Sequence, residues 1–175
     1  MVRRFTRLAA LLAIGPIAAI GCGRDQEVPV GVTSVRLAVV AGAQHGGMPF
    51  RTEMTQEVWH APNPRDYAGD PDGTGWALIT VNRGQKEVCW EVSASNIVLP
   101  ARAAHIHKAA PFAQGPITIG LTPPAENNGS WSACASPPAV NWATVEEIVA
   151  NPGDYYVNVH NDEFPSGAVR GQLGQ

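Results

Sequence analysis

The amino-acid sequence predicts an all-β protein, an antiparallel β-sandwich of the Greek-key or immunoglobulin-like kind with one short helix. Three observations predict this fold class. Glycine and proline account for 18 and 15 of the 175 residues, and both favour turns between short strands over long helices. Several short segments alternate apolar and polar residues, which is the pattern of a strand with one buried face. A single segment, residues 144–150, has the apolar spacing of a helix.

Length and charge narrow the class of protein further. A chain of 175 residues is long enough for one domain with its own hydrophobic core. The formal net charge is −3, and three arginines (Arg3, Arg4 and Arg7) are gathered at the very start of the chain. The remainder has no basic surface of the kind that binds nucleic acid, so we expect no nucleic-acid partner.

Residues 1–22 have the pattern of an export signal that ends in a lipidation site. A basic start is followed by the apolar run Leu8–Ile20, which is shorter than the ~20 residues that span a bilayer. The segment Ala19-Ile20-Gly21-Cys22 resembles a bacterial lipobox, in which the cysteine is lipidated. We therefore expect an exported protein that a lipid on Cys22 anchors to a membrane of the cell envelope. A cleaved signal with an incidental cysteine is the alternative.

The chain that follows divides into a tether and one domain. Residues 23–34 are polar with proline and glycine, which predicts a flexible tether. The domain is expected over residues 35–175, with a first strand at residues 35–40. Residues 41–74 are rich in glycine, proline and aspartate, and we expect them to form a long loop or insertion, with residues 50–59 as the candidate for a short strand within it.

A hairpin is predicted next. Residues 76–81 and 88–94 both have strand character, and residues 82–85 supply the turn between them. Trp76 and Trp90 lie on these strands and are expected in the core.

The second half of the chain contains further strands and the helix. Alternation predicts four strands, at residues 103–107, 115–121, 155–160 and 168–173, and residues 122–138 are expected to be turns. The helix at residues 144–150 should begin with a capping box of Thr144 and Glu147. It should end at Asn151-Pro152-Gly153.

Two cysteines remain once the signal is removed, Cys89 and Cys134. In an exported chain they most simply form one disulfide, and two free thiols are the alternative. The bond would close a loop of about 45 residues and stabilise the fold by about 4 kcal/mol. Cys89 alternates with Trp90, so the disulfide is expected on the outer surface of the sheet.

Three segments of the chain carry a family resemblance: AAHIHKA, GPITIGL and NPGDYYVNVHNDEFPSGAVRGQL. Together they resemble the CHRD domain, over a region from about Val35 to the end. The resemblance implies an extracytoplasmic β-sandwich and no established activity for bacterial members. Relatives often carry a G-A-x-E-x-P-P segment after the first strand. We match it to GAQHGGMPF, where His45 replaces the usual acid.

Three histidines belong to these motifs. His105 and His107 are separated by one residue, so in a strand both imidazoles lie on the same face. With His160 from a second motif, they would form a set of ligands suited to copper or zinc. A structural role, in which the histidines bond loop carbonyls or carboxylates, is the competing interpretation. His160 directly precedes the acidic segment Asn161-Asp162-Glu163, which offers it a carboxylate partner.

The other motif residues point to a structural role. Arg170 is expected to form an ion pair with Asp154 or Asp162, and a position facing a ligand is the alternative. The remaining motif positions that we expect to support the fold are Asn158, Gly171 and Gln172. The sequence contains neither a nucleophile elbow nor a spaced carboxylate pair. We therefore expect an anchored, non-enzymatic binding or structural module with a partner at the cell surface. A metal-binding protein or metal-dependent redox enzyme that uses the three histidines is the alternative.

Overall fold

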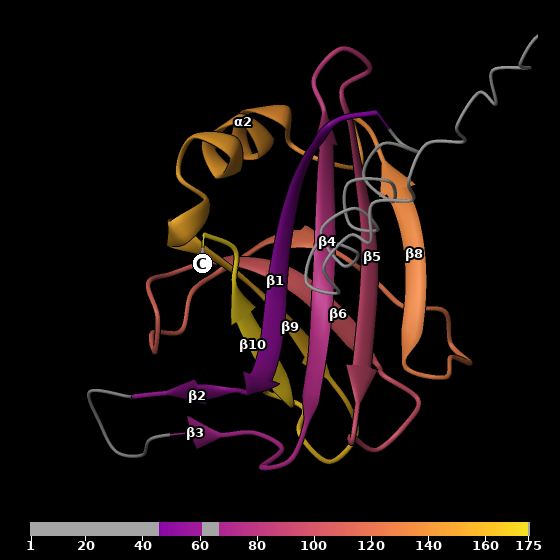
Figure 1. Cartoon of the computed structure of the whole chain (residues 1–175), viewed down its shortest axis with the longest axis vertical. Helices are drawn as coiled ribbons and strands as arrows, with labels where there is room; N and C mark the ends of the chain where they lie inside the picture. Colours follow the sequence, from indigo (N-terminus) through magenta and orange to yellow (C-terminus); the bar gives the residue numbers. More distant parts are fainter. Residues whose placement is uncertain (1–45, 61–66, 175) are drawn as a thin grey trace, which may run out of the picture.

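The computed structural model describes residues 46–60 and 67–174 (Figure 1). The predicted export signal, the tether, Cys22 and the strand at residues 35–40 all lie outside the described residues.

Eight strands form one antiparallel sheet, in the order β7-β6-β9-β10-β1-β4-β5-β8. Their bounds are β1 Met48–Gln56, β4 Thr74–Asn82, β5 Glu87–Ser95, β6 Ala103–Lys108, β7 Ile117–Gly120, β8 Ser130–Ala135, β9 Tyr155–His160 and β10 Val169–Gln172. Two short strands, β2 (Val58–Trp59) and β3 (Tyr67–Ala68), pair separately and project from one end of the sheet (Figure 1). The prediction of an all-β fold is confirmed.

The sheet becomes a sandwich because it curls at β1. Residues 48–54 of β1 pair with β4, whereas Thr55 and Gln56 pair with β10. One strand therefore belongs to both halves of the sheet. Glycine at position 171 of β10 allows the backbones of β10 and β1 to lie close together, because a Cβ atom at this position would lie 2.3 Å from the Glu53 carbonyl oxygen.

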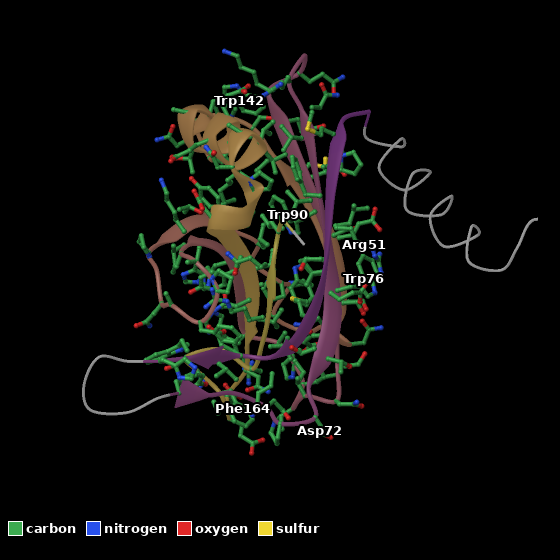
Figure 2. The ribbon with its side chains drawn as sticks, turned by 60° about the vertical axis from the view of Figure 1, so that its left-hand side comes forward. Arg51, Asp72, Trp76, Trp90, Trp142 and Phe164 are labelled. Atoms are coloured by element: carbon green, nitrogen blue, oxygen red, sulfur yellow. A yellow bond between two sulfur atoms is a disulfide. The ribbon has the colours of Figure 1, made fainter. Side chains whose placement is uncertain are left out.

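The core lies between the two halves. In β9, Tyr155, Val157 and Val159 point inward, and each side chain is completely buried. Trp90 also points into the space between the halves, as predicted (Figure 2). The prediction for Trp76 is wrong: it pairs with Ser93, which puts it on the outer face, where the Arg51 guanidinium lies 4.8 Å from its ring (Figure 2).

Helix α2 (Trp142–Ala150) lies at one end of the sandwich (Figure 1) and buries Val145 and Ile148. The predicted capping box is wrong. Asn141 is the N-cap, and its side chain accepts a hydrogen bond from the Ala143 amide at 3.0 Å. Thr144 therefore lies inside the helix, where its side chain cannot cap the first turn. No helix in the described part of the chain is long and apolar enough to cross a membrane.

Two segments that were expected to be loops contain strands. The expected loop at residues 41–74, with its candidate short strand at residues 50–59, contains β1, a nine-residue strand at the centre of the sheet. The sequence of β1 does not alternate clearly between apolar and polar residues, because the polar Thr52 occupies an inward position. Its hydroxyl donates to the Gln172 carbonyl at 2.8 Å. The turn-rich segment 122–138 contains β8, in which Trp131 is the buried side chain.

The disulfide is formed between Cys89 and Cys134, as predicted. The two residues lie directly opposite each other on β5 and β8. Trp90, the neighbour of Cys89 on β5, faces the core, so the disulfide lies on the outer face of the sheet.

Candidate metal centre

The register of three neighbouring strands places the polar motif residues on one face of the sheet. His105 of β6 lies opposite Asn158 of β9, and Asn158 lies opposite Arg170 of β10. Residues that face each other in an antiparallel pair have side chains on the same side. This side is opposite to Val157 and Val159, so the motif residues occupy the outer face.

The three motif histidines converge on this face. The ring nitrogens His105 Nδ1 and His160 Nε2 are 3.0 Å apart, and each of the three residues offers a nitrogen within 4.8 Å of the other two. His105 and His160 are half-buried, whereas His107 is 8% exposed. The cluster therefore has one enclosed side and one side that an ion can reach.

Backbone carbonyl groups fix the orientation of two of the rings. His107 Nδ1 donates to the Gly115 carbonyl at 2.9 Å, and His160 Nδ1 donates to the Pro165 carbonyl at 3.1 Å. A carbonyl oxygen only accepts, so both Nδ1 atoms carry the proton and both Nε2 atoms have a lone pair, of which the one on His160 accepts from His105 Nδ1 at 3.0 Å. His107 Nε2 is buried and forms no hydrogen bond of acceptable geometry within the described protein.

Burial keeps the three imidazoles neutral. It lowers the pKa of His105 to about 4, assisted by repulsion from His160 and His107. Burial also lowers the pKa values of His107 and His160, against the opposing effect of their bonds to Gly115 and Pro165. Neutral imidazoles are the form that binds a metal ion.

A stack of side chains supports the His107 ring. It lies parallel to the Tyr156 ring, with 4.8 Å between centroids, and the Arg170 guanidinium lies 3.3 Å from the centroid of Tyr156. Cation–π attraction of this kind holds the tyrosine in place and, through it, the imidazole.

Arg170 and Gln172 hold the loop that follows β6. Arg170 donates to the carbonyl groups of Ala113 at 2.8 Å and Ala110 at 3.0 Å. Gln172 donates to the carbonyl groups of Ala109 and Gly153. This loop supplies the Gly115 carbonyl that orients His107, so the RGQ motif positions a wall of the histidine cluster.

The predicted acidic partners are wrong. Arg102 takes both oxygens of Asp162, at 2.9 and 2.6 Å, which leaves this carboxylate unavailable to Arg170 or His160. The interpretation in which histidines bond loop carbonyls is confirmed for His107 and His160. His107 Nε2 is left without a hydrogen bond in the described residues, whereas His160 Nε2 lies 3.0 Å from both His105 Nδ1 and Asn158 Oδ1.

Sequence reasoning missed Glu57, which follows β1. Its side chain is 1% exposed, and burial raises its pKa to about 7 against the opposing effects of Asn158 and Arg170. Asn158 Nδ2 donates to Glu57 Oε2 at 3.0 Å, and Asn158 Oδ1 lies 3.0 Å from His160 Nε2. The amide of Asn158 thus joins a buried carboxylate to the histidine cluster.

A second group of possible ligands, Glu87 with Cys89 and Cys134, lies elsewhere in the described residues. The two sulfur atoms are bonded to each other. The histidine cluster is therefore the stronger candidate for a metal centre.

Comparison with known proteins identifies the family. The model described as the CHRD domain matches residues 50–173, and no curated protein and no solved structure matches the chain. The match begins at Phe50, within β1. The segment GAQHGGMPF lies mostly before this match, and the assignment of the usual acid to His45 stays a prediction because His45 lies outside the described residues. The match spans more than two thirds of the chain, which therefore belongs to the CHRD domain family.

Proposed function

We propose that this CHRD domain binds one transition-metal ion, copper or zinc, through His105, His107 and His160. One observation carries the proposal: each of the three neutral imidazoles offers a ring nitrogen within 4.8 Å of the other two, and two of them donate their other N–H to backbone carbonyl groups. Histidines that bind metal ions in proteins nearly always have this second bond, which fixes the tautomer and the ring orientation.

The distances suit a small ion after a modest adjustment. Bonds of about 2.0–2.1 Å require ligand nitrogens that are roughly 3–4 Å apart. The pair His105 Nδ1 and His160 Nε2, at 3.0 Å, already meets this requirement. The widest separation in the cluster, at most 4.8 Å, would close by about 1 Å on binding. Imidazole nitrogen is a preferred ligand of copper and zinc, which favours these metals over calcium or magnesium.

Metal titration tests the proposal. The full chain, purified in detergent without a histidine tag and treated with a chelator, is titrated with Cu²⁺ and Zn²⁺ by calorimetry, and its metal content is measured. We expect one ion per chain and a loss of affinity of at least about tenfold in His105→Ala. His60→Ala removes an exposed histidine outside the cluster and serves as the matched control. The proposal is wrong if neither metal binds, or if His105→Ala binds as tightly as the unchanged chain.

We also propose that the domain is exported and anchored through a lipid on Cys22, where it acts as a binding or structural module. The basic start, the apolar run before Cys22 and the disulfide between Cys89 and Cys134 support this location, because disulfides persist in oxidising compartments. Palmitate labelling of cells that produce the chain, followed by fractionation, tests it. We expect label in the membrane fraction that disappears in Cys22→Ala. Unlabelled protein in the cytoplasm would contradict both parts.

A further inference from the structure

We infer that Glu57 and Asn158 complete the metal centre. The side-chain oxygen of Asn158 is a fourth ligand, and the buried Glu57 carboxylate holds that oxygen in place and balances the charge of the ion. This inference rests on the proposed function, since it assigns two further residues to the same centre.

Backbone hydrogen bonds and a neighbouring glycine hold the Glu57 carboxylate in its buried position. The Glu57 amide donates to the Ala168 carbonyl at 3.0 Å, and the Gly69 amide donates to the Glu57 carbonyl at 2.7 Å. Gly167 lies beside the carboxylate with φ of +128°, and a Cβ atom there would lie 1.8 Å from Glu57 Oε2. The position therefore requires glycine both for its backbone conformation and for the space that the carboxylate occupies.

The Glu57 carboxyl group lies against one end of the Asn158 amide. Asn158 Nδ2 donates to Glu57 Oε2 at 3.0 Å, and an ionised carboxylate, the form that a bound cation favours, accepts this bond. The oxygen is then directed at His160 Nε2, also at 3.0 Å. Asn158 is close enough to His107 to influence its pKa as well, which places the amide between two of the three rings.

This arrangement brings two lone pairs together. His160 donates through Nδ1 to the Pro165 carbonyl, so its Nε2 has a lone pair, which accepts from His105 Nδ1 at 3.0 Å and also faces the lone pairs of Asn158 Oδ1. Two acceptors at hydrogen-bond distance repel each other, and the single His105 N–H beside them offsets only part of that repulsion. A metal ion bound by both atoms removes this repulsion.

Charge supplies the second part of the inference. Three neutral imidazoles and an amide oxygen leave the charge of a divalent ion uncompensated in a partly buried site, which is unfavourable. Glu57 is buried, and a single hydrogen-bonded amide separates it from the cluster. A carboxylate in this position offsets the charge of the ion without occupying a ligand position.

The test uses a reversal of the Glu57–Asn158 hydrogen bond. Glu57→Gln removes the negative charge but keeps the shape of the side chain. It also frees the Asn158 amide to turn over. We expect this variant to bind Cu²⁺ and Zn²⁺ about 10–100-fold more weakly than the unchanged chain. Adding Asn158→Asp moves the carboxylate to position 158, where the new amide at position 57 can donate to it, and affinity should return to at least that of the unchanged chain. Glu53→Gln, an exposed carboxamide substitution on β1, is the matched control and should change nothing.

Spectroscopy separates a ligand from a structural support. The electron paramagnetic resonance spectrum of the Cu²⁺ form should change in the Glu57→Gln/Asn158→Asp double variant, because a carboxylate oxygen replaces an amide oxygen at the ion. It should not change in Glu53→Gln. Circular dichroism and urea unfolding of each variant establish that the fold is intact.

The outcomes distinguish this inference from the proposed function. If the unchanged chain binds neither metal, the proposed function is wrong and the inference falls with it. If the unchanged chain binds metal and folded Glu57→Gln binds it equally well, only the inference is wrong. A folded double variant that binds no more tightly than Glu57→Gln, or whose copper spectrum is unchanged, also overturns it.

Discussion

Replacing Glu57 by glutamine should stabilise the domain above neutral pH. Burial raises the pKa of Glu57 from 4.5 to about 7, so the folded chain keeps a proton that the unfolded chain has already lost. Between these pH values the folded state binds more protons, and the free energy of unfolding therefore falls as the pH rises. Glutamine does not titrate, and the variant should escape this loss.

The size of the effect follows from the two pKa values. The difference between 4.5 and about 7 corresponds to about 3 kcal/mol, at about 1.36 kcal/mol for each pH unit. This figure is an upper value, because the ionised side chain can relax toward water. We expect Glu57→Gln and the unchanged chain to differ little near pH 5, and the variant to be more stable by about 2–3 kcal/mol near pH 8.

Urea unfolding of the metal-free protein near both pH values, with chelator and without reductant, measures the difference. Glu53→Gln is the control, because Glu53 is exposed on the same strand and its loss should give no pH-dependent change. The reasoning is refuted if the stability difference between Glu57→Gln and the unchanged chain is the same at both pH values. That result would show that Glu57 ionises in the folded state as it does in the unfolded chain.

Three other changes have predictable outcomes. Replacing Cys89 and Cys134 by alanine opens a loop with a sequence separation of 45 and should lower the free energy of unfolding by about 4 kcal/mol, measured by urea unfolding without reductant. Because the pKa of His105 is lowered to about 4, metal affinity should hold as the pH falls below about 6.5, where a solvated histidine site would lose it; calorimetry near pH 7.5 and 5.5 tests this. Arg170→Lys loses the planar contact with Tyr156 and the paired bonds to the loop at residues 108–116. It should lower stability by about 1–3 kcal/mol and speed proteolysis within that loop.

The sequence predicted the strands in which alternation coincides with burial. In β9, tyrosine and valine occupy the inward positions, and in β5 Val88, Trp90 and Val92 do the same. Strand β8 was missed, and β1 was expected only as a short strand within a long loop, because small or polar residues occupy most of the positions in both strands. Their place in the sheet depends on distant partners, such as the Gln172 carbonyl that satisfies Thr52.

The candidate site was predicted in part. The spacing of His105 and His107 put both rings on one face, and the family motif supplied His160. Their convergence depends on the register of β6 against β9, which local sequence does not contain. Glu57 was missed for a related reason: its burial comes from contacts with Gly167 and Asn158, about a hundred residues further along the chain.

The outer face of this sheet departs from the usual design of a sandwich. Antiparallel sheets commonly bury one face and leave the other in water. Here Tyr156, Asn158, Arg170 and Gln172 lie on the outer face and are all at least 92% buried. The desolvation free energy of burying apolar residues in such a space would be lower than that of burying an arginine, two amides and a carboxylate.

Stability alone therefore does not explain the polar face. Almost every polar group on it is satisfied by a named partner, yet Glu57 has a strongly raised pKa and His107 Nε2 has no hydrogen bond within the described protein. Proteins tend to retain such locally unfavourable groups where a ligand makes use of them. A metal ion would satisfy both groups at once, since it gives His107 Nε2 a ligand bond and gives the Glu57 carboxylate a positive charge nearby. The same substitution, Glu57→Gln, should then raise the stability of the metal-free domain and lower its affinity for the ion. A polar network with a purely structural role would not change these two quantities in opposite directions.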